Sequence, residues 1–150
     1  MIKISPKQIA WFIPIAYLMH LADEYFTGFP GWFSEVLNVS LSLNDFVIIN
    51  SFGFTATIVI VTLYSFNKVP LFVISTLGVL FFINGIIHVV STILTSSYSP
   101  GTATGLFIYF PLGYIIYKKV FPLLKDQQRT FSFVIAIVLQ IIVALIAFNV

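Results

Sequence analysis

The chain has 150 residues, of which 59% are hydrophobic, 17% aromatic and only 8% charged, with a formal net charge of +2. A soluble domain carries roughly 25% charged residues, so this composition indicates an integral membrane protein. The small, dispersed positive charge argues against a nucleic-acid surface, and the absence of cysteine excludes disulfides and thiolate metal sites. No repeat or linker interrupts residues 1–150, which we expect to form one transmembrane domain.

Five apolar runs predict membrane-spanning helices, because a hydrocarbon core about 30 Å thick takes about 20 helical residues to cross. The fourth run is short and contains Pro111, which spanning helices tolerate when neighbouring groups satisfy the backbone. The predicted fold class is all-α: a polytopic transmembrane helix bundle with about five spanning helices and a short external interfacial helix. The predicted spans are residues 8–26, 46–66, 69–94, 102–117 and 131–148.

The first predicted span contains three ionisable side chains, His20, Asp23 and Glu24, inside an otherwise apolar run. Such groups cost about 2.5 to 3.5 kcal/mol each at the centre of a spanning helix, so they are rarely left there without a partner or a task. Residues three or four apart share one face of a helix, so the three side chains can project together. The sequence therefore predicts a site within the membrane.

The external segment 27–45 is too polar to span, but Trp32, Phe33, Val36 and Leu37 recur at helical spacing after a Pro-Gly pair. This pattern predicts a short helix lying at the outer interface, where tryptophan is favoured. Two interpretations remain open. The segment is either a lid over the site or an ordinary connecting loop with an aromatic anchor.

Polar residues in the later spans fall at the depth of the first group. At 1.5 Å per residue, Asn84 and His88 of the third span reach the same outer third of the membrane as His20 and Glu24. The fourth span returns from the external side and brings Tyr109 to a similar level. We therefore expect one external-facing pocket. The second span is expected to add Asn50, Ser51 and Thr55.

The basic residues predict the orientation, because they concentrate on the cytoplasmic side of membrane proteins. In a five-span arrangement all seven fall on one side, which gives a cytoplasmic N-terminus and an external C-terminus. The external side comprises residues 27–45, 95–101 and the terminal Asn149 and Val150. The seven residues are Lys3, Lys7, Lys68, Lys118, Lys119, Lys125 and Arg129.

The motif of the first span is written His20-Leu21-Ala22-Asp23-Glu24. With it, the chain resembles the small bacterial membrane proteins named for an HXXEE motif, with Asp23 in place of the first glutamate. The resemblance extends to residues 84–88 and 98–105, and so to most of the chain. It implies a related topology in the bacterial cytoplasmic membrane and related site residues. It implies no reaction, because the function of the family is unknown.

Imidazole nitrogens and carboxylate oxygens in this pattern suit a divalent metal ion such as zinc, iron or manganese. The candidate ligands are His20, Glu24, Asp23 and His88. Asn84 either adds a carbonyl ligand or orients an imidazole. A cation would also neutralise the carboxylates at this depth. Whether Asp23 is a ligand or supports one stays open.

With a metal ion, the first-ranked activity is hydrolysis of an ester or amide bond in a lipid-like substrate from the outer leaflet; isomerisation and oxidation stay open. Whichever of Asp23 and Glu24 is not a ligand is a candidate general base, and Tyr109 is a candidate hydrogen-bond donor to the substrate. Membrane lipids are the expected partners. The oligomeric state does not follow from these residues.

Two alternatives from other classes remain. In a proton-coupled carrier or channel, Asp23 or Glu24 would bind and release protons while His20 and His88 relay them. In a non-catalytic membrane protein, the same groups would only form interhelical hydrogen bonds, worth about 0.6 to 2 kcal/mol each.

Residues 98–105 also have two interpretations. Gly101 and Thr102 precede the fourth span, where free backbone amides could bind an anionic head group. Alternatively, the segment is a Pro-Gly turn with a threonine cap and a small-residue packing face from Gly101 to Gly105, the interpretation that we favour.

Overall fold

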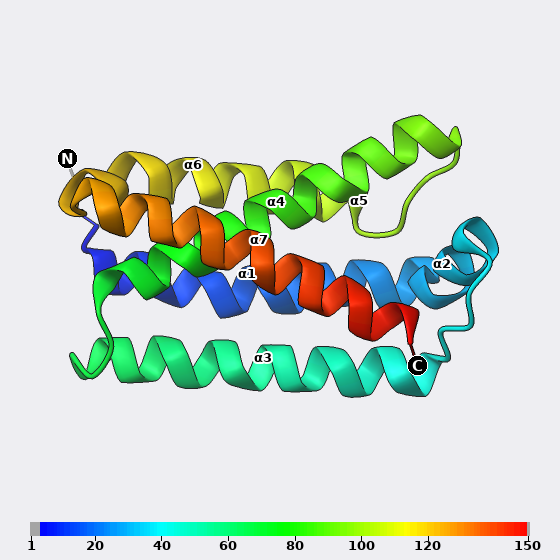
Figure 1. Cartoon of the computed structure of the whole chain (residues 1–150), viewed down its shortest axis with the longest axis horizontal. Coiled ribbons are helices and arrows are strands. Elements are labelled where there is room, and N and C mark those ends of the chain that lie inside the picture. The colour runs from blue at the N-terminus through cyan, green and yellow to red at the C-terminus, as the bar shows by residue number, and fades with distance from the viewer. Residues whose placement is uncertain (1–3, 150) are drawn as a thin grey trace.

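The computed structural model describes residues 4–149, which fold into a bundle of long helices with their axes along one direction (Figure 1). No strand occurs in this part of the chain, so the all-α class is confirmed. Four of the helices are long: α1 (Pro6–Thr27), α3 (Leu43–Ser65), α4 (Leu71–Thr95) and α7 (Asp126–Phe148). A fifth rod is continuous through three pieces: α5 (Thr102–Thr104), the π-helix η1 (Gly105–Tyr109) and α6 (Phe110–Lys119). The short elements are α2 (Phe29–Leu37) and the 3-10 turn η2 (Phe121–Leu123).

Four described segments are long and apolar enough to cross a membrane, one fewer than the five spans that the sequence predicts. They are Leu43–Ser65, Leu71–Thr95, Thr102–Leu123 and Asp126–Phe148. The difference is α1, because Lys7, His20, Asp23 and Glu24 lower its hydropathy. Its 22 residues nevertheless run beside the others along the bundle (Figure 1). The chain is therefore a multi-pass membrane protein by the length and composition of its helices.

Local sequence signals account for the ends of α1 and α2. Ser5 caps α1 and forms a capping box with Gln8, in which each side chain binds the other residue's backbone amide. Gly28 ends α1 and begins α2 at φ +81°, a left-handed conformation that favours glycine. The prediction of a short helix within residues 27–45 is confirmed by α2.

The fourth predicted span contains a π-helix immediately before its proline. Pro111 has no amide hydrogen to give to the preceding turn, and the backbone widens to π geometry over Gly105–Tyr109 before α6 continues. Segments of this kind are frequent at functional sites. Here the π-helix ends at Tyr109, which is buried against the polar residues described below.

The outer surface of the bundle is apolar, as a lipid-facing surface requires. Even α1, the helix with the most charged residues among the long ones, exposes Trp11, Phe12, Ile15 and Leu18, each at least 43% accessible. On α7 the same pattern extends along the helix, where Ile137, for example, is exposed. These helices therefore fit a hydrocarbon environment on their outer faces.

The described basic residues gather at one end of the bundle, where α1 and α7 begin, α6 ends and α3 turns into α4 (Figure 1). Lys7 donates to the Ser65 carbonyl there at 2.9 Å. The helix α7 ends at the opposite end. Lys3 and Val150, which also entered the orientation argument, lie outside the described residues.

The interior differs between these two ends. Near the basic end, fully buried aliphatic side chains fill the space between α1, α4 and α6; we call this region the closed half. Toward α2, the helices α4 and α7 diverge after crossing (Figure 1), and the side chains there surround a cavity; we call this region the cavity half. The closed half is defined by Ile9, Ile13, Ile74, Ile116 and Val120.

Candidate metal centre

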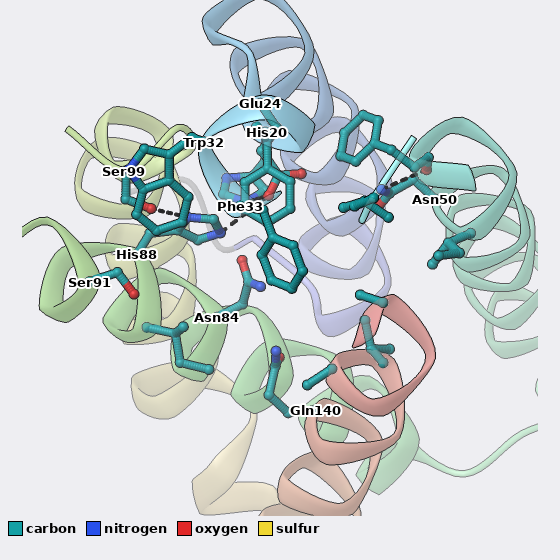
Figure 2. A pocket seen from close by; sticks show the side chains of 18 of the residues that line it. His20, Glu24, Trp32, Phe33, Asn50, Asn84, His88, Ser91, Ser99 and Gln140 are labelled. Atoms are coloured by element: carbon teal, nitrogen blue, oxygen red, sulfur yellow. Dashed lines mark hydrogen bonds and ion pairs between the residues drawn. The ribbon is translucent and has the colours of Figure 1, made fainter. Parts of the chain in front are cut away.

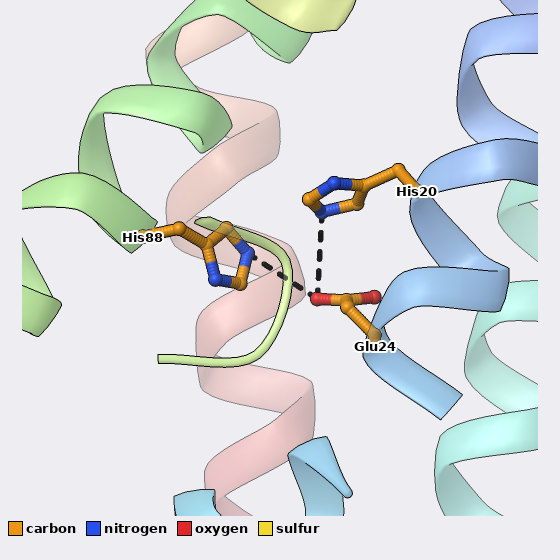
Figure 3. Close-up of side chains that lie close together, drawn as sticks. All are labelled: His20, Glu24 and His88. Atoms are coloured by element: carbon orange, nitrogen blue, oxygen red, sulfur yellow. Dashed lines mark ion pairs between the residues drawn. The ribbon is translucent and has the colours of Figure 1, made fainter. Parts of the chain in front are cut away.

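Three ionisable side chains converge in the cavity half: His20 and Glu24 from α1 and His88 from α4 (Figure 3). They are at most 6% exposed. One nitrogen or oxygen from each lies within 4.8 Å of the others. His20 and Glu24 are one helical turn apart, and α4 brings His88 to the same depth. The three side chains together could hold a metal ion.

The spacing of the donor atoms fits this possibility. Glu24 Oε1 lies 3.5 Å from His20 Nε2 and 3.2 Å from His88 Nε2. In a tetrahedral site with metal–ligand distances near 2.0 to 2.1 Å, neighbouring ligand atoms are roughly 3.4 Å apart. Both distances are therefore close to those that a metal ion imposes on its ligands.

A hydrogen-bond relay behind His20 determines which of its nitrogens carries the proton. His20 Nδ1 lies 2.7 Å from Thr104 Oγ1. The Thr104 hydroxyl has a single proton, with acceptors in Asp23 Oδ2 at 2.8 Å and the Gly101 carbonyl at 3.2 Å. Because that proton is directed to one of these oxygens, Thr104 accepts from His20 Nδ1–H. In a neutral imidazole Nε2 then presents a lone pair to Glu24.

His20 Nε2 is buried and has no hydrogen-bond partner within residues 4–149. Its nearest charged neighbour is the Glu24 carboxylate, which also accepts hydrogen bonds when it is ionised. Two buried acceptors at this distance repel each other unless a cation or a proton lies between them. The cluster thus has the donor set and the electrostatic need for a positive charge.

His88 is held by the loop after α4. Its Nδ1 lies 3.2 Å from Ser99 Oγ, and its carbonyl accepts from Thr102 Oγ1 at 3.1 Å. Metal-binding histidines usually bond a second group through the ring nitrogen that does not bind the metal, which fixes the ring. Both histidines therefore have such a partner in residues 98–105.

Gly101 lies directly against both imidazole rings. Its φ is +94°, and a Cβ there would stand 2.8 Å from His20 Cε1 and 3.0 Å from His88 Cε1. Glycine is thus required by the backbone conformation and by the close approach. The segment 98–105 wraps the histidine pair, and its glycine is a packing residue, in line with the favoured interpretation of this segment.

Aromatic rings complete the walls of the cluster. Tyr109 stacks on His20 with ring centroids 4.3 Å apart and on Phe81 at 4.8 Å. Phe29, at the start of α2, meets the edge of His88 at 5.7 Å. The stacked rings restrict the imidazoles and keep water from that side.

The other predicted site residues lie at different places around the cluster. The Asp23 carboxylate is directed away from it and accepts from the Thr104 amide at 3.1 Å and from the Thr104 hydroxyl. Asn84 lies one turn before His88 on α4, and its Oδ1 is buried with no partner in the described chain. Tyr109 contacts the cluster through its ring. The structure thus brings Tyr109 against His20, whereas Asp23 reaches His20 only through Thr104.

The cluster opens into a cavity of about 550 Å³ (Figure 2). The helix α2 lies over one side, where Trp32 Nε1 donates to Ser97 Oγ at 3.0 Å. Asn50 of α3 lines the cavity, as expected, and binds the Tyr17 hydroxyl at 3.2 Å. The prediction that Ser51 and Thr55 join the same pocket is wrong: both face outward on α3, because they lie on the opposite side of that helix.

Three residues of the site were not singled out individually from the sequence. Ser99 and Thr104 were quoted only as part of a segment, and their partners are far away in the chain. Gln140 of α7 also lines the cavity. The sequence does contain a signal for it, since Gln140 is the one amide in the apolar run between Gln128 and Asn149.

Most of the chain, including the three candidate ligands, matches one protein family. A family model described as a protein of unknown function with an HXXEE motif matches residues 11–117. No curated protein and no solved structure matches the chain. The match covers α1 to α6, and therefore His20, Glu24 and His88 together with the loop that holds them. The chain belongs to the HXXEE family.

Proposed function

We propose that this HXXEE protein binds a divalent metal ion with His20, Glu24 and His88 and hydrolyses an ester or amide bond in a lipid-like substrate. The observation that carries the proposal is the buried Nε2 of His20, which makes no hydrogen bond in the described chain and lies 3.5 Å from Glu24 Oε1. A metal ion would satisfy both groups and would polarise a water molecule and the bond that it attacks. Zinc, iron and manganese all accept two imidazoles and one carboxylate.

The surrounding residues support distinct roles. Asp23 holds the Thr104 hydroxyl so that His20 keeps its Nε2 lone pair toward the centre. Asn84 Oδ1 is a buried acceptor beside the same space, suited to an additional ligand or to a hydrogen bond from bound water. Tyr109 packs on His20 and borders the cavity into which a substrate would enter. The sequence left open whether Asp23 is a ligand, a general base or a residue that supports a ligand, and we assign it the last of these roles.

The location follows from the charges. We propose that the basic end of the bundle faces the cytoplasm of a bacterial cell, because positive residues are retained on that side. The N-terminus would then be cytoplasmic and the C-terminus external. The cavity half would lie in the outer leaflet, within reach of lipids from that leaflet.

Elemental mass spectrometry tests the metal site directly. The protein is purified without a metal-affinity column and compared with the His20→Ala, His88→Ala and Glu24→Gln variants. We expect close to one metal ion per wild-type chain and a loss of it in all three variants. Glu35→Gln is the matched control, because Glu35 is exposed on α2 and should leave the metal content unchanged. A folded wild-type protein that binds none of the three metals after reconstitution would disprove the site.

The hydrolase part needs its own test. Metal-loaded protein in lipid nanodiscs is offered ester and amide lipids, and the release of free fatty acid is followed by mass spectrometry. Release by the wild type and its absence in Glu24→Gln support hydrolysis. If the protein binds one metal ion per chain but releases fatty acid from none of these lipids, the proposed hydrolysis is disproved and the proposed metal site is not.

A second candidate function is supported by one observation. The same contacts form a chain of groups from Glu24 through His20 and Thr104 to the half-buried Asp23. In a proton-coupled transporter, protons in place of a metal ion would occupy the gap between His20 and Glu24 and move along this chain. Proton flux into proteoliposomes that is lost in Glu24→Gln, with no bound metal, would favour this function over hydrolysis.

A further inference from the structure

The cavity beside the cluster has the size of one acyl chain. Its volume of about 550 Å³ lies within the usual range for ligand cavities. Groups the size of a water molecule occupy about 30 Å³ each, so it holds roughly 18 of them. A methylene group is of similar size. A single long acyl chain therefore fills the space, whereas two such chains need about twice the volume.

The lining of the cavity is apolar over most of its surface, with side chains from α2, α3, α4 and α7. Phe33, Phe46 and Ala144 are examples from three of these helices. Such a wall favours a hydrocarbon over any polar ligand, because burying polar groups without partners is costly. The walls thus suit a chain and offer few partners to a sugar, a nucleotide or a peptide backbone.

Two amide side chains are the exception near the metal ligands. Asn84 on α4 and Gln140 on α7 both project into the cavity (Figure 2). Asn84 Oδ1 is buried without a partner, although an amide buried in an apolar wall normally finds one. A pair of amides can donate to a carbonyl oxygen and accept from an N–H or O–H group. They are therefore placed to bind a polar head that carries such groups.

The edge of the cavity reaches the outer surface between α4 and α7. Ile87 and Ile141 line it from these two helices, yet they remain 41% and 53% exposed. Both helices are candidate membrane spans, so an opening between them faces the hydrocarbon of the bilayer. A ligand that enters there comes from the membrane and not from water.

We infer that the cavity takes one acyl chain of a membrane amphiphile from the bilayer, and that the side-chain N–H groups of Asn84 and Gln140 donate to the ester or amide carbonyl of its head beside the His20–Glu24–His88 cluster. The unpartnered Asn84 Oδ1 then stays available to the metal ion or to bound water. The inference rests on the proposed function, because it names the substrate class of that site. The bond to be hydrolysed is then the one that joins the acyl chain to its head. Asn84 and Gln140 are specificity-determining residues, and the cavity selects the chain.

The two tryptophans of the chain provide the test. Trp32 lines the cavity, whereas Trp11 lies on α1 and does not. The Trp11→Phe variant therefore reports on the cavity alone, and Trp32→Phe reports on the bulk lipid. Each is placed in nanodiscs and titrated with a monoacylglycerol that carries bromine in its chain, because bromine quenches a nearby tryptophan. We expect saturable quenching of Trp32 at low mole fraction and linear, weak quenching of Trp11.

A matched pair of probes tests the head group. The brominated monoacylglycerol has an ester carbonyl, and the corresponding alkyl glycerol ether lacks it. We expect the ester to bind about 2- to 10-fold more tightly than the ether, the contribution of one net hydrogen bond. In Gln140→Leu and Asn84→Leu this preference should fall toward one. Equal affinity for both probes in the wild type would overturn the assignment of the two amides.

A matched pair of variants tests the cavity itself. Ala144→Phe fills the space from α7, whereas Leu145→Phe changes the neighbouring residue, which is 56% exposed and outside the lining. Saturable quenching should disappear in the first variant and persist in the second. Equal, linear quenching of Trp32 and Trp11 in the otherwise unchanged protein would overturn the inference.

Metal-free protein separates this inference from the proposed function. Saturable quenching in protein that binds no metal would support the acyl-chain site and disprove the metalloenzyme. One bound metal ion per chain with only linear quenching would support the metal site and disprove the acyl-chain site. The two proposals can therefore fail independently.

Discussion

The closed half and the cavity half are built from the same helices, but the first is packed with aliphatic side chains and the second surrounds a cavity with polar groups. In the closed half α1 presents Ile9 and Ile13 to α4 and α6, and these side chains are fully buried. About two turns later the same face of α1 presents His20 and Glu24 to a cavity. The change requires only that α4 and α7 diverge after they cross (Figure 1). One half thus fixes the helices, and the other uses their separation to hold polar groups.

Glycines mark both halves for different reasons. In the closed half they allow helices to touch: a Cβ on Gly78 would stand 2.5 Å from Ile116 Cδ1. In the cavity half Gly101 allows a loop to touch two imidazoles. Changes at these two glycines should therefore separate the stability of the bundle from the binding of metal.

Gly101→Ala should have the largest effect. A left-handed backbone costs a non-glycine residue about 1 to 2 kcal/mol, and overpacking adds about 1 to 3 kcal/mol. Because the new Cβ meets both histidine rings, we expect loss of bound metal as well as a lower melting temperature. Metal content and thermal unfolding measure these. Gly31→Ala is the control, since nothing lies within 4 Å of its Cβ position. Unchanged metal binding in Gly101→Ala would contradict the close contact.

Gly78→Ala should destabilise the closed half by about 1 to 3 kcal/mol through overpacking against Ile116. Metal affinity should change little, because the ligands lie in the other half. Thermal unfolding in detergent and a metal titration on the same sample give the two values. In an Ile116→Ala background the additional cost of Gly78→Ala should be smaller, since the atoms that clash are then absent. A matching fall in metal affinity would show that the halves are coupled.

Thr104→Val should act only in the cavity half. It removes the hydroxyl that fixes the His20 ring, and the loss of such a partner weakens metal binding about 10- to 100-fold. Thr104→Ser keeps the hydroxyl and serves as the matched control. Competition with a chelator measures the affinity. If the valine and serine variants bind the metal ion with equal affinity, the Thr104 hydroxyl does not contribute to metal binding.

Trp32→Phe should have the smallest effect. It removes one hydrogen bond to Ser97, which contributes about 0.5 to 1.5 kcal/mol to the position of α2. We expect faster amide hydrogen exchange in α2 with no change in metal content. Ser97→Ala removes the same bond from the other side together with the contact between Ser97 Oγ and Thr95 Oγ1, so its effect should be at least as large. A larger effect in Trp32→Phe than in Ser97→Ala would assign the change to the indole ring rather than to the bond.

The fold is largely readable from the sequence because the bilayer simplifies the problem. Continuous apolar runs predict helices, and the rise per residue places His20 and His88 at one depth. Four of the five predicted spans have the length and hydropathy of a membrane span, and α1 falls short because the groups that make it informative also make it less apolar. The match of a family model confirms the resemblance that the motif indicated.

The details of the site depend on contacts that no local pattern contains. Viewed down the axis of α1, the side chain of Asp23 points about 60° to one side of His20 and that of Glu24 about 40° to the other side. Helical periodicity alone therefore cannot decide which of the two carboxylates faces His88. Thr104 decides it, because its amide and hydroxyl both bind Asp23. The sequence does not single out Gln140 for a similar reason: only the packing of α7 against α4 places it in the wall of the cavity.

The loop that holds the histidines also sets an order of assembly. The partners of His20 and His88 lie in residues 99–104, which follow the whole of α4 in the chain. During synthesis and insertion the ligands are therefore all present before the groups that orient them. Because a metal site that is completed by folding contributes its binding energy to the folded state, the ion should bind as a late step. A chain truncated before Gly101 would keep every ligand and still lack a finished site.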